Sequence, residues 1–281
     1  MSLGNGGNLT FGGSSDFNGS FIGVNPLLVI GARTTYIGHI MVTQLPRSEV
    51  EKVLRSGLRL SDLATNPGTA TAMHPIIILA GRQTELTWNV PGWPTLPEQN
   101  NYNELMLLIP FVTSATGTKW HNYVVRMYLD SADAVTVGNQ WWGYQKEMAA
   151  LTIPAATGTI SVSQGCDRKF EATTTAASGL ANYSELQKIL SMPILATLNP
   201  TSNPVDSCSY FVFDWTAAQA QPENVKMSFE KTFLSPAVSN PPSTGMDPWV
   251  TRGQLANSPG WAFGIQNVHW QITYAFQCRF N

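Results

Sequence analysis

Near the end of residues 127–148, a cluster of aromatic side chains is followed within two residues by a lysine, Lys146. Trp141, Trp142 and Tyr144 precede this lysine, in a chain whose charged residues make up only 12% of the composition. If the rings bury Lys146, the loss of hydration disfavours its ammonium form and lowers its pKa. The neutral amine can then attack a carbonyl carbon near neutral pH and form a Schiff base. The alternative is a surface lysine whose aliphatic stem covers the rings while its ammonium group stays in water.

Composition and charge limit the kinds of partner. The chain has 281 residues, of which 43% are hydrophobic, and a formal net charge of −2 without a basic cluster. These values indicate a folded globular protein and argue against nucleic acid or an anionic membrane as partner. No stretch approaches the roughly 20 apolar residues of a membrane-spanning helix, and the first residues lack the features of a secretory signal. We therefore expect a cytoplasmic protein with no nucleic-acid or membrane partner.

The cysteines and histidines have no spacing typical of a metal site. The cysteines are odd in number and far apart, and the histidines form no HExxH or HxH motif; these residues are Cys166, Cys208, Cys278, His39, His74, His121 and His269. This spacing argues against a disulfide framework and against a zinc site. Phosphate-binding glycine motifs and the GxSxG nucleophile motif are absent from the sequence. We expect neither a cofactor nor a bound metal.

Two helices and a series of strands are expected to position the reactive residues. Ser48 and Glu51 form a capping box at the start of a helix over residues 48–58. A second helix begins at Ser184 and ends at Pro193. Segments rich in β-branched and aromatic residues predict strands at 76–79, 105–112, 123–129, 134–137, 159–163, 210–213 and 269–276.

The strands come in runs instead of alternating with helices, which favours an α+β protein built on antiparallel sheets. We expect a single domain over residues 21–281, preceded by a flexible Gly/Asn/Ser-rich arm at residues 1–20. Two Pro-rich loops, at residues 91–101 and 235–259, are of the kind that forms active-site lids, subunit contacts or disordered segments.

Two ungapped patches connect these features to a known family. The first contains Tyr-Leu-Asp at residues 128–130, a glycine at 138, and Tyr-Gln-Lys-Glu at residues 144–147. The second, YNELMLLIPF at residues 102–111, contains Glu104. Both resemble the acetoacetate decarboxylase family, in which Tyr-Leu-Asp, a glycine and an aromatic turn lead to the Schiff-base lysine, and Tyr-x-Glu precedes Ile-Pro. Arg33 precedes the first predicted helix much as the family's substrate-binding arginine does.

The resemblance implies a fold, a reaction and a set of site residues. The implied fold has antiparallel β-sheets forming a cone-like barrel with a few packed helices, and family members usually form homo-oligomers. The implied reaction is decarboxylation of an acetoacetate-like β-keto acid by a carboxy-lyase that forms a Schiff base. Lys146 would be the nucleophile and Glu104 a proton relay, while Arg33, Tyr144 and Trp142 would contact the substrate.

Three departures from the family pattern keep other functions open. Glu147 replaces a second lysine, and its carboxylate would raise the pKa of Lys146 if it faced the amine. Asn139 and Gln140 replace two charged residues, and residues 74–81 show no match to a further glutamate. The same imine also serves aldol addition, retro-aldol cleavage and dehydration. A non-catalytic protein that binds a small molecule is the remaining alternative.

Overall fold

The computed structural model describes residues 2–3, 9–10, 30–61, 73–88, 101–178, 184–198, 205–229, 262–278 and 280. The predicted N-terminal arm lies outside these residues except for two short strands, β1 (Ser2–Leu3) and β2 (Leu9–Thr10), which pair with each other. The predicted loop at 235–259 lies outside them, as does the loop at 91–101 except for Asn101.

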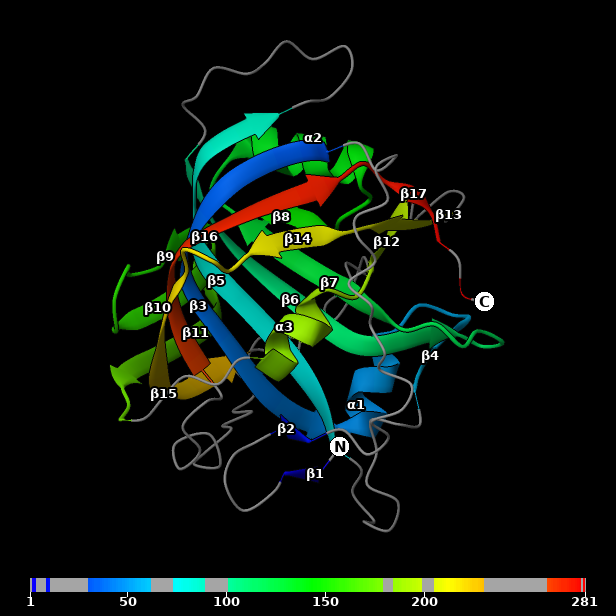
Figure 1. Ribbon diagram of the computed structural model, residues 1–281, viewed down its shortest axis with the longest axis horizontal. Coiled ribbons are helices and arrows are strands. Elements are labelled where there is room, and N and C mark those ends of the chain that lie inside the picture. Colours follow the sequence, from blue (N-terminus) through cyan, green and yellow to red (C-terminus); the bar gives the residue numbers. More distant parts are fainter. Residues whose placement is uncertain are drawn as a thin grey trace.

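Fifteen strands form one sheet, in which most neighbours are antiparallel (Figure 1). They are β3 (Ile30–Pro46), β4 (Leu58–Leu60), β5 (Met73–Trp88), β6 (Tyr102–Ser114), β7 (His121–Leu129), β8 (Lys146–Met148), β9 (Ala150–Thr152), β10 (Thr159–Gln164), β11 (Asp167–Ala176), β12 (Ile194–Leu198), β13 (Val205–Ser209), β14 (Phe211–Asp214), β15 (Gln219–Phe229), β16 (Ala262–Thr273) and β17 (Phe276–Gln277). The hydrogen-bonded order is β17-β13-β12-β7-β6-β5-β3-β16-β15-β11-β10-β9, with β14 on β16, β4 on β6 and β8 on β7. The β7–β12 and β7–β8 pairings are parallel.

The sheet curves strongly, so that strands from one end of this order return to its middle. Gln164, the last residue of β10, donates hydrogen bonds to the carbonyl of Met148 (3.1 Å) and to the carboxylate of Glu147 (2.8 Å), both on β8. β9 also lies against β6 and β7. The hydrogen-bonded path does not close into a ring within the described strands. The predicted α+β class, with antiparallel sheet and few helices, is confirmed.

The core is densest where β5, β6 and β7 lie side by side. Residues 76–80 of β5 and 105–109 of β6 are each at most 1% exposed. Strands covered on both faces need apolar side chains at every position, which explains why these segments are unbroken hydrophobic runs. Polar residues at the ends of these runs, such as Gln83 and Glu104, are drawn into the same buried layer.

The first predicted helix is shorter than expected. α1 spans Arg47–Lys52 and has no side-chain hydrogen bond at its N-terminus, so the predicted capping box of Ser48 and Glu51 is wrong. Glu51 instead accepts a hydrogen bond from Arg47 Nε (2.7 Å). The guanidinium group of Arg47 also donates hydrogen bonds to the backbone carbonyls of Leu60 and Ser61. These bonds connect α1 to the end of β4, and residue 58, where the predicted helix ends, is the first residue of that strand. The predicted helix at Ser184 is confirmed as α3 (Ser184–Leu190).

The predicted strand at residues 134–137 is wrong, because this segment lies in α2 (Ala132–Trp141). Ser131 caps the helix by accepting a hydrogen bond from the backbone N–H of Ala134 (3.4 Å). Ala134, Val137 and Gly138 form its buried face, and their spacing of three and four residues is that of a helix. The run is too short for its β-branched residues to outweigh the cap and the tertiary packing. Among the described residues, no helix is both long enough and apolar enough to cross a bilayer.

Cys208 on β13 and Cys278, just after β17, form a disulfide, although their spacing had argued against a disulfide framework. Their Cα atoms are 5.0 Å apart, within the usual range for such a bond. The two cysteines are 70 residues apart in sequence, and the antiparallel pairing of β13 with β17 brings them together. The third cysteine, Cys166, is exposed and has no disulfide partner.

Candidate active site

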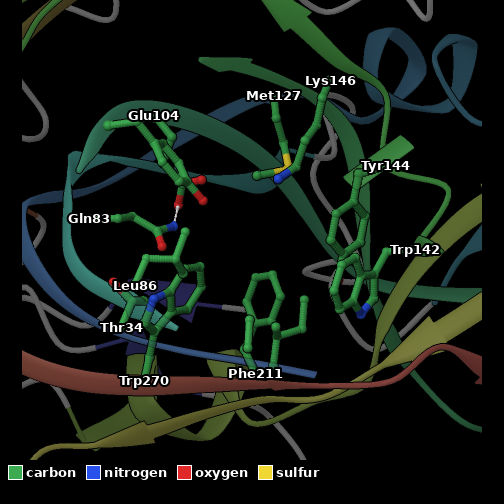
Figure 2. Close-up of a pocket in the computed structure, with 13 residues that line it drawn as sticks. Thr34, Gln83, Leu86, Glu104, Met127, Trp142, Tyr144, Lys146, Phe211 and Trp270 are labelled. Atoms are coloured by element: carbon green, nitrogen blue, oxygen red, sulfur yellow. Dashed lines mark hydrogen bonds between the residues drawn. The ribbon is translucent and has the colours of Figure 1, made fainter. Parts of the chain in front are cut away.

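A cavity in the concave side of the curved sheet contains Lys146 and Glu104 (Figure 2). Strands β3, β5, β6, β7, β14 and β16, with the segment from the end of α2 to β8, supply its lining. The lining residues are Ala32, Thr34, Gln83, Leu86, Tyr102, Glu104, Met127, Trp142, Tyr144, Lys146, Phe211, Trp270 and Ile272. Among them Lys146 and Glu104 carry the ionisable amine and carboxyl groups, and the walls are mainly aromatic and aliphatic.

The backbone of Lys146 is fixed by the strand and helix on either side of it. Lys146 begins β8, where it pairs with Met127 of β7. The side chain of Asn139, in α2, binds both of its backbone groups: Oδ1 accepts from the Lys146 N–H (2.8 Å) and Nδ2 donates to its carbonyl (3.0 Å). In the sequence, Asn139 differs from the family pattern only by replacing a charged residue. The structure shows that its side chain holds the backbone of Lys146.

Gly138 leaves space for the side chain of Lys146. A Cβ atom at this position would lie 2.7 Å from Lys146 Nζ and closer still to the stem carbons, which is too close for any real contact. The glycine therefore allows the lysine stem to pass directly over the last turn of α2 and reach the cavity.

Burial controls the charge of the Lys146 amine. The residue is 8% exposed, and the ring centroid of Tyr144 is 5.8 Å from Nζ. Burial lowers the pKa of Lys146 from 10.5 to about 8, and the nearby carboxyl of Glu104 opposes this shift. Burial also raises the pKa of Glu104, which Lys146 and a hydrogen bond from Gln83 partly offset. Each group thus favours the charged form of the other, while the apolar walls disfavour both charges.

Glu104 presents one carboxyl oxygen to the cavity. Its Oε1 accepts a hydrogen bond from Gln83 Nε2. Its Oε2 is buried and has no hydrogen-bond partner among the described residues. In Figure 2 the carboxyl group points into the space that Lys146 enters from the other side. An unpartnered buried carboxyl oxygen is costly in a folded protein and is characteristic of a binding or catalytic group.

Trp142 and Tyr144 form one aromatic wall of the cavity, and their polar atoms are hydrogen-bonded to Thr273 and Ser209. The rings are nearly parallel, at an interplanar angle of 11° and a centroid distance of 6.4 Å. Trp142 Nε1 donates to the carbonyl of Thr273 (2.7 Å), and the Tyr144 hydroxyl is hydrogen-bonded to Ser209 Oγ (2.6 Å). These bonds fix the rings from β16 and β13, so both residues contribute apolar surface to the cavity.

Glu147 faces away from Lys146. Successive residues of a strand point to opposite faces, and Glu147 follows Lys146 on β8. Its carboxylate forms an ion pair with Arg126 (Nε–Oε1 3.2 Å) and accepts a hydrogen bond from Gln164 (2.8 Å). The carboxylate that could have raised the pKa of Lys146 is therefore occupied on the other side of the sheet.

Arg33 lies outside the cavity. It is exposed on β3, between Ala32 and Thr34, whose side chains line the cavity. The structure thus brings Lys146 and Glu104 together but does not place Arg33 with them. The remaining lining residues were not predicted, because they come from strands far apart in sequence and no local motif marks them. Within the described residues, no group of three or more His, Cys, Asp or Glu side chains is arranged to hold a metal ion.

Comparison with solved structures shows that the chain has an acetoacetate decarboxylase-like fold. One acetoacetate decarboxylase structure superposes with a TM-score of 0.56 at 14% identity, covering 88% of each chain. The enzyme from Legionella pneumophila gives a TM-score of 0.53 at 12% identity, covering 88% of this chain and 86% of that one. The enduracididine biosynthesis enzyme MppR, solved with pyruvate, gives 0.52 at 13% identity, covering 89% and 90%. No family model and no curated protein sequence matches the chain.

Proposed function

We propose that this protein is a Schiff-base-forming carbon–carbon lyase that acts on a keto acid through Lys146. The observation that carries the proposal is a buried amine with a pKa of about 8 in the same cavity as the unpartnered Glu104 oxygen. The resemblance of the lysine segment to the acetoacetate decarboxylase family and the shared fold support the same chemistry.

The lowered pKa makes the amine reactive near neutral pH. With a pKa of about 8, roughly a tenth of the Lys146 amines are neutral at pH 7. At the unperturbed pKa of about 10.5 the neutral fraction would be on the order of 0.03%. Burial thus increases the nucleophilic fraction by about 300-fold.

A β-keto acid would lose CO2 through an imine and an enamine on Lys146. The neutral amine adds to the ketone, one proton is taken up and water leaves, which gives a protonated imine. The bond to the carboxylate then breaks, its electron pair moves into the imine to form an enamine, and CO2 departs. A proton adds to the enamine carbon, and water releases the ketone and the free amine. In this proposal Glu104, which lines the same cavity, exchanges protons during imine formation and enamine protonation.

Aldol chemistry through the same imine is the second candidate. The Glu104 Oε2 atom has no partner in the described structure, so it can accept the proton of a substrate hydroxyl during retro-aldol cleavage. MppR, a neighbour in fold, was solved with the condensation product of pyruvate and an imidazole aldehyde. A β-hydroxy carbonyl substrate would then cleave to an enamine and an aldehyde without loss of CO2.

Borohydride trapping tests the proposal. The protein is incubated separately with acetoacetate and pyruvate, reduced with sodium borohydride, and analysed by peptide mass spectrometry. We expect an adduct on Lys146 that is lost in Lys146→Met and retained in Lys52→Met, a control at an exposed lysine. CO2 release from acetoacetate then distinguishes decarboxylation from aldol chemistry. The absence of an adduct on Lys146 with either keto acid would refute the proposed function.

A further inference from the structure

Gln83 is the polar residue of the cavity that the sequence did not point to. It lies on β5 and is 2% exposed. On the neighbouring strand, Glu104 pairs directly with Gly81, two residues before Gln83, so the two side chains lie on the same face of the sheet. Gln83 Nε2 donates a hydrogen bond to Glu104 Oε1 (Figure 2).

This hydrogen bond determines which oxygen of Glu104 is available. With Oε1 held by the amide, the carboxyl group cannot rotate freely, and Oε2 remains as the oxygen without a partner in the described structure. The ring of Tyr36 occupies the space where a Cβ of Gly81, the residue that pairs with Glu104, would lie.

We propose that Gln83 is a positioning residue that holds Glu104 with Oε2 toward the substrate bound at Lys146 and, as a non-ionisable donor, maintains Glu104 as a carboxylate. The inference rests on the proposed function for its chemical meaning, because the carboxylate exchanges protons with the imine. The effect of Gln83 on the protonation of Glu104 and Lys146 can be measured without turnover.

The coupling between Gln83, Glu104 and Lys146 predicts the direction in which each substitution shifts the pKa of Lys146. The Gln83 hydrogen bond lowers the pKa of Glu104, and the Glu104 charge raises the pKa of Lys146. Removing the donor therefore favours protonated Glu104 and so lowers the pKa of Lys146. Replacing the amide with a second carboxyl adds negative charge once both carboxyls have ionised, and this charge raises the pKa of Lys146. The two substitutions thus act in opposite directions.

The other ionisable groups facing the pair do not obscure this effect. Tyr36, Tyr102 and Tyr144 surround it, and burial raises the pKa of each tyrosine above its usual value of 10, so all three stay neutral through the titration of Lys146. The charges of Glu147 and its ion-pair partner lie on the other face of β8.

The experiment titrates two side chains by NMR in the full-length protein. The carboxyl carbon of Glu104 is assigned with Glu104→Gln, and the ε-carbon of Lys146 is assigned with Lys146→Met. We expect Gln83→Leu to move the Glu104 midpoint to higher pH and the Lys146 midpoint about half a pH unit lower. We expect the near-isosteric Gln83→Glu to move the Lys146 midpoint upward by a similar amount.

Gln164→Leu is the matched control. It also removes an amide that donates to a glutamate, but that glutamate is Glu147, which faces away from the cavity. We expect it to leave the Lys146 midpoint unchanged. Unchanged Glu104 and Lys146 midpoints in both Gln83 variants would overturn the proposal, as would shifts of the same sign in the two variants.

Borohydride trapping then separates this inference from the proposed function. If Lys146 forms imines, the pH midpoint of trapping should follow the NMR midpoint in each Gln83 variant, in opposite directions. Opposite NMR shifts without any trapping would support the positioning role of Gln83 and refute the imine chemistry. Trapping with a midpoint that neither substitution moves would support the chemistry and refute the role of Gln83.

Discussion

Replacing Gly138 with alanine should separate the reactivity of Lys146 from the stability of the fold. The new Cβ would lie 2.7 Å from Lys146 Nζ, whereas ordinary contacts are about 3.5–4.0 Å, so the head group must move by roughly 1 Å. The lysine stem is the flexible partner and will yield before the helix backbone does. In addition, alanine is favoured over glycine inside a helix by about 1 kcal/mol, which offsets part of the crowding. We therefore expect little change in thermal stability.

The chemical consequence should be large. A displacement of about 1 Å at a reacting group can reduce its rate by about 100-fold, and we expect a loss of that order in imine formation. The assay is the rate of borohydride trapping with acetoacetate, measured beside a thermal melt. Thr136→Ala, at an exposed position of the same helix, provides a control for helix propensity. Wild-type trapping by Gly138→Ala with an unchanged melt would refute the packing argument.

Three further predictions follow from the site and its supports. Glu104→Gln removes the charge that raises the pKa of Lys146, so the pKa should fall below about 8 and the acid limb of imine trapping should move to lower pH; an unmoved limb would contradict the coupling. Ser209→Ala leaves the buried Tyr144 hydroxyl without its partner and should lower the free energy of unfolding by about 1–3 kcal/mol, measured by urea denaturation and contradicted by an unchanged midpoint. Cys278→Ser removes the disulfide and should cost about 2–4 kcal/mol in the same assay under oxidising conditions, with no difference from wild type once the latter is reduced.

Several elements could be predicted from local sequence because their signals are local. Segments rich in β-branched and aromatic residues identified strands within β5 and β6, and the spacing of apolar residues after Ser184 identified α3. The strand predicted at residues 134–137 is wrong. Its β-branched residues favour a strand locally, but the Ser131 cap stabilises a helix there. The disulfide was missed because sequence spacing says nothing about which distant strands will pair.

Some residues of the candidate site could likewise be predicted from local sequence, and others could not. The aromatic run before Lys146 and the Tyr-x-Glu pattern around Glu104 pointed to the amine and the carboxyl group that line the cavity. Gln83 carries no such pattern, and its importance appears only where β5 and β6 pair. Arg33 was predicted to bind substrate because it precedes the first predicted helix. Strand alternation places its side chain on the exposed side of β3.

The sequence by itself determined the chemical inventory of this protein: an amine preceded by aromatic rings, a carboxyl beside an apolar run, and a chain rich in strands. Only the tertiary structure decided the charge state and direction of those groups. Burial depends on surfaces assembled from segments far apart in the chain, and it is burial that lowers the pKa of Lys146 to about 8. Strand alternation on β8 then turns Glu147 away from the amine, while the β5–β6 pairing places Gln83 and Glu104 side by side.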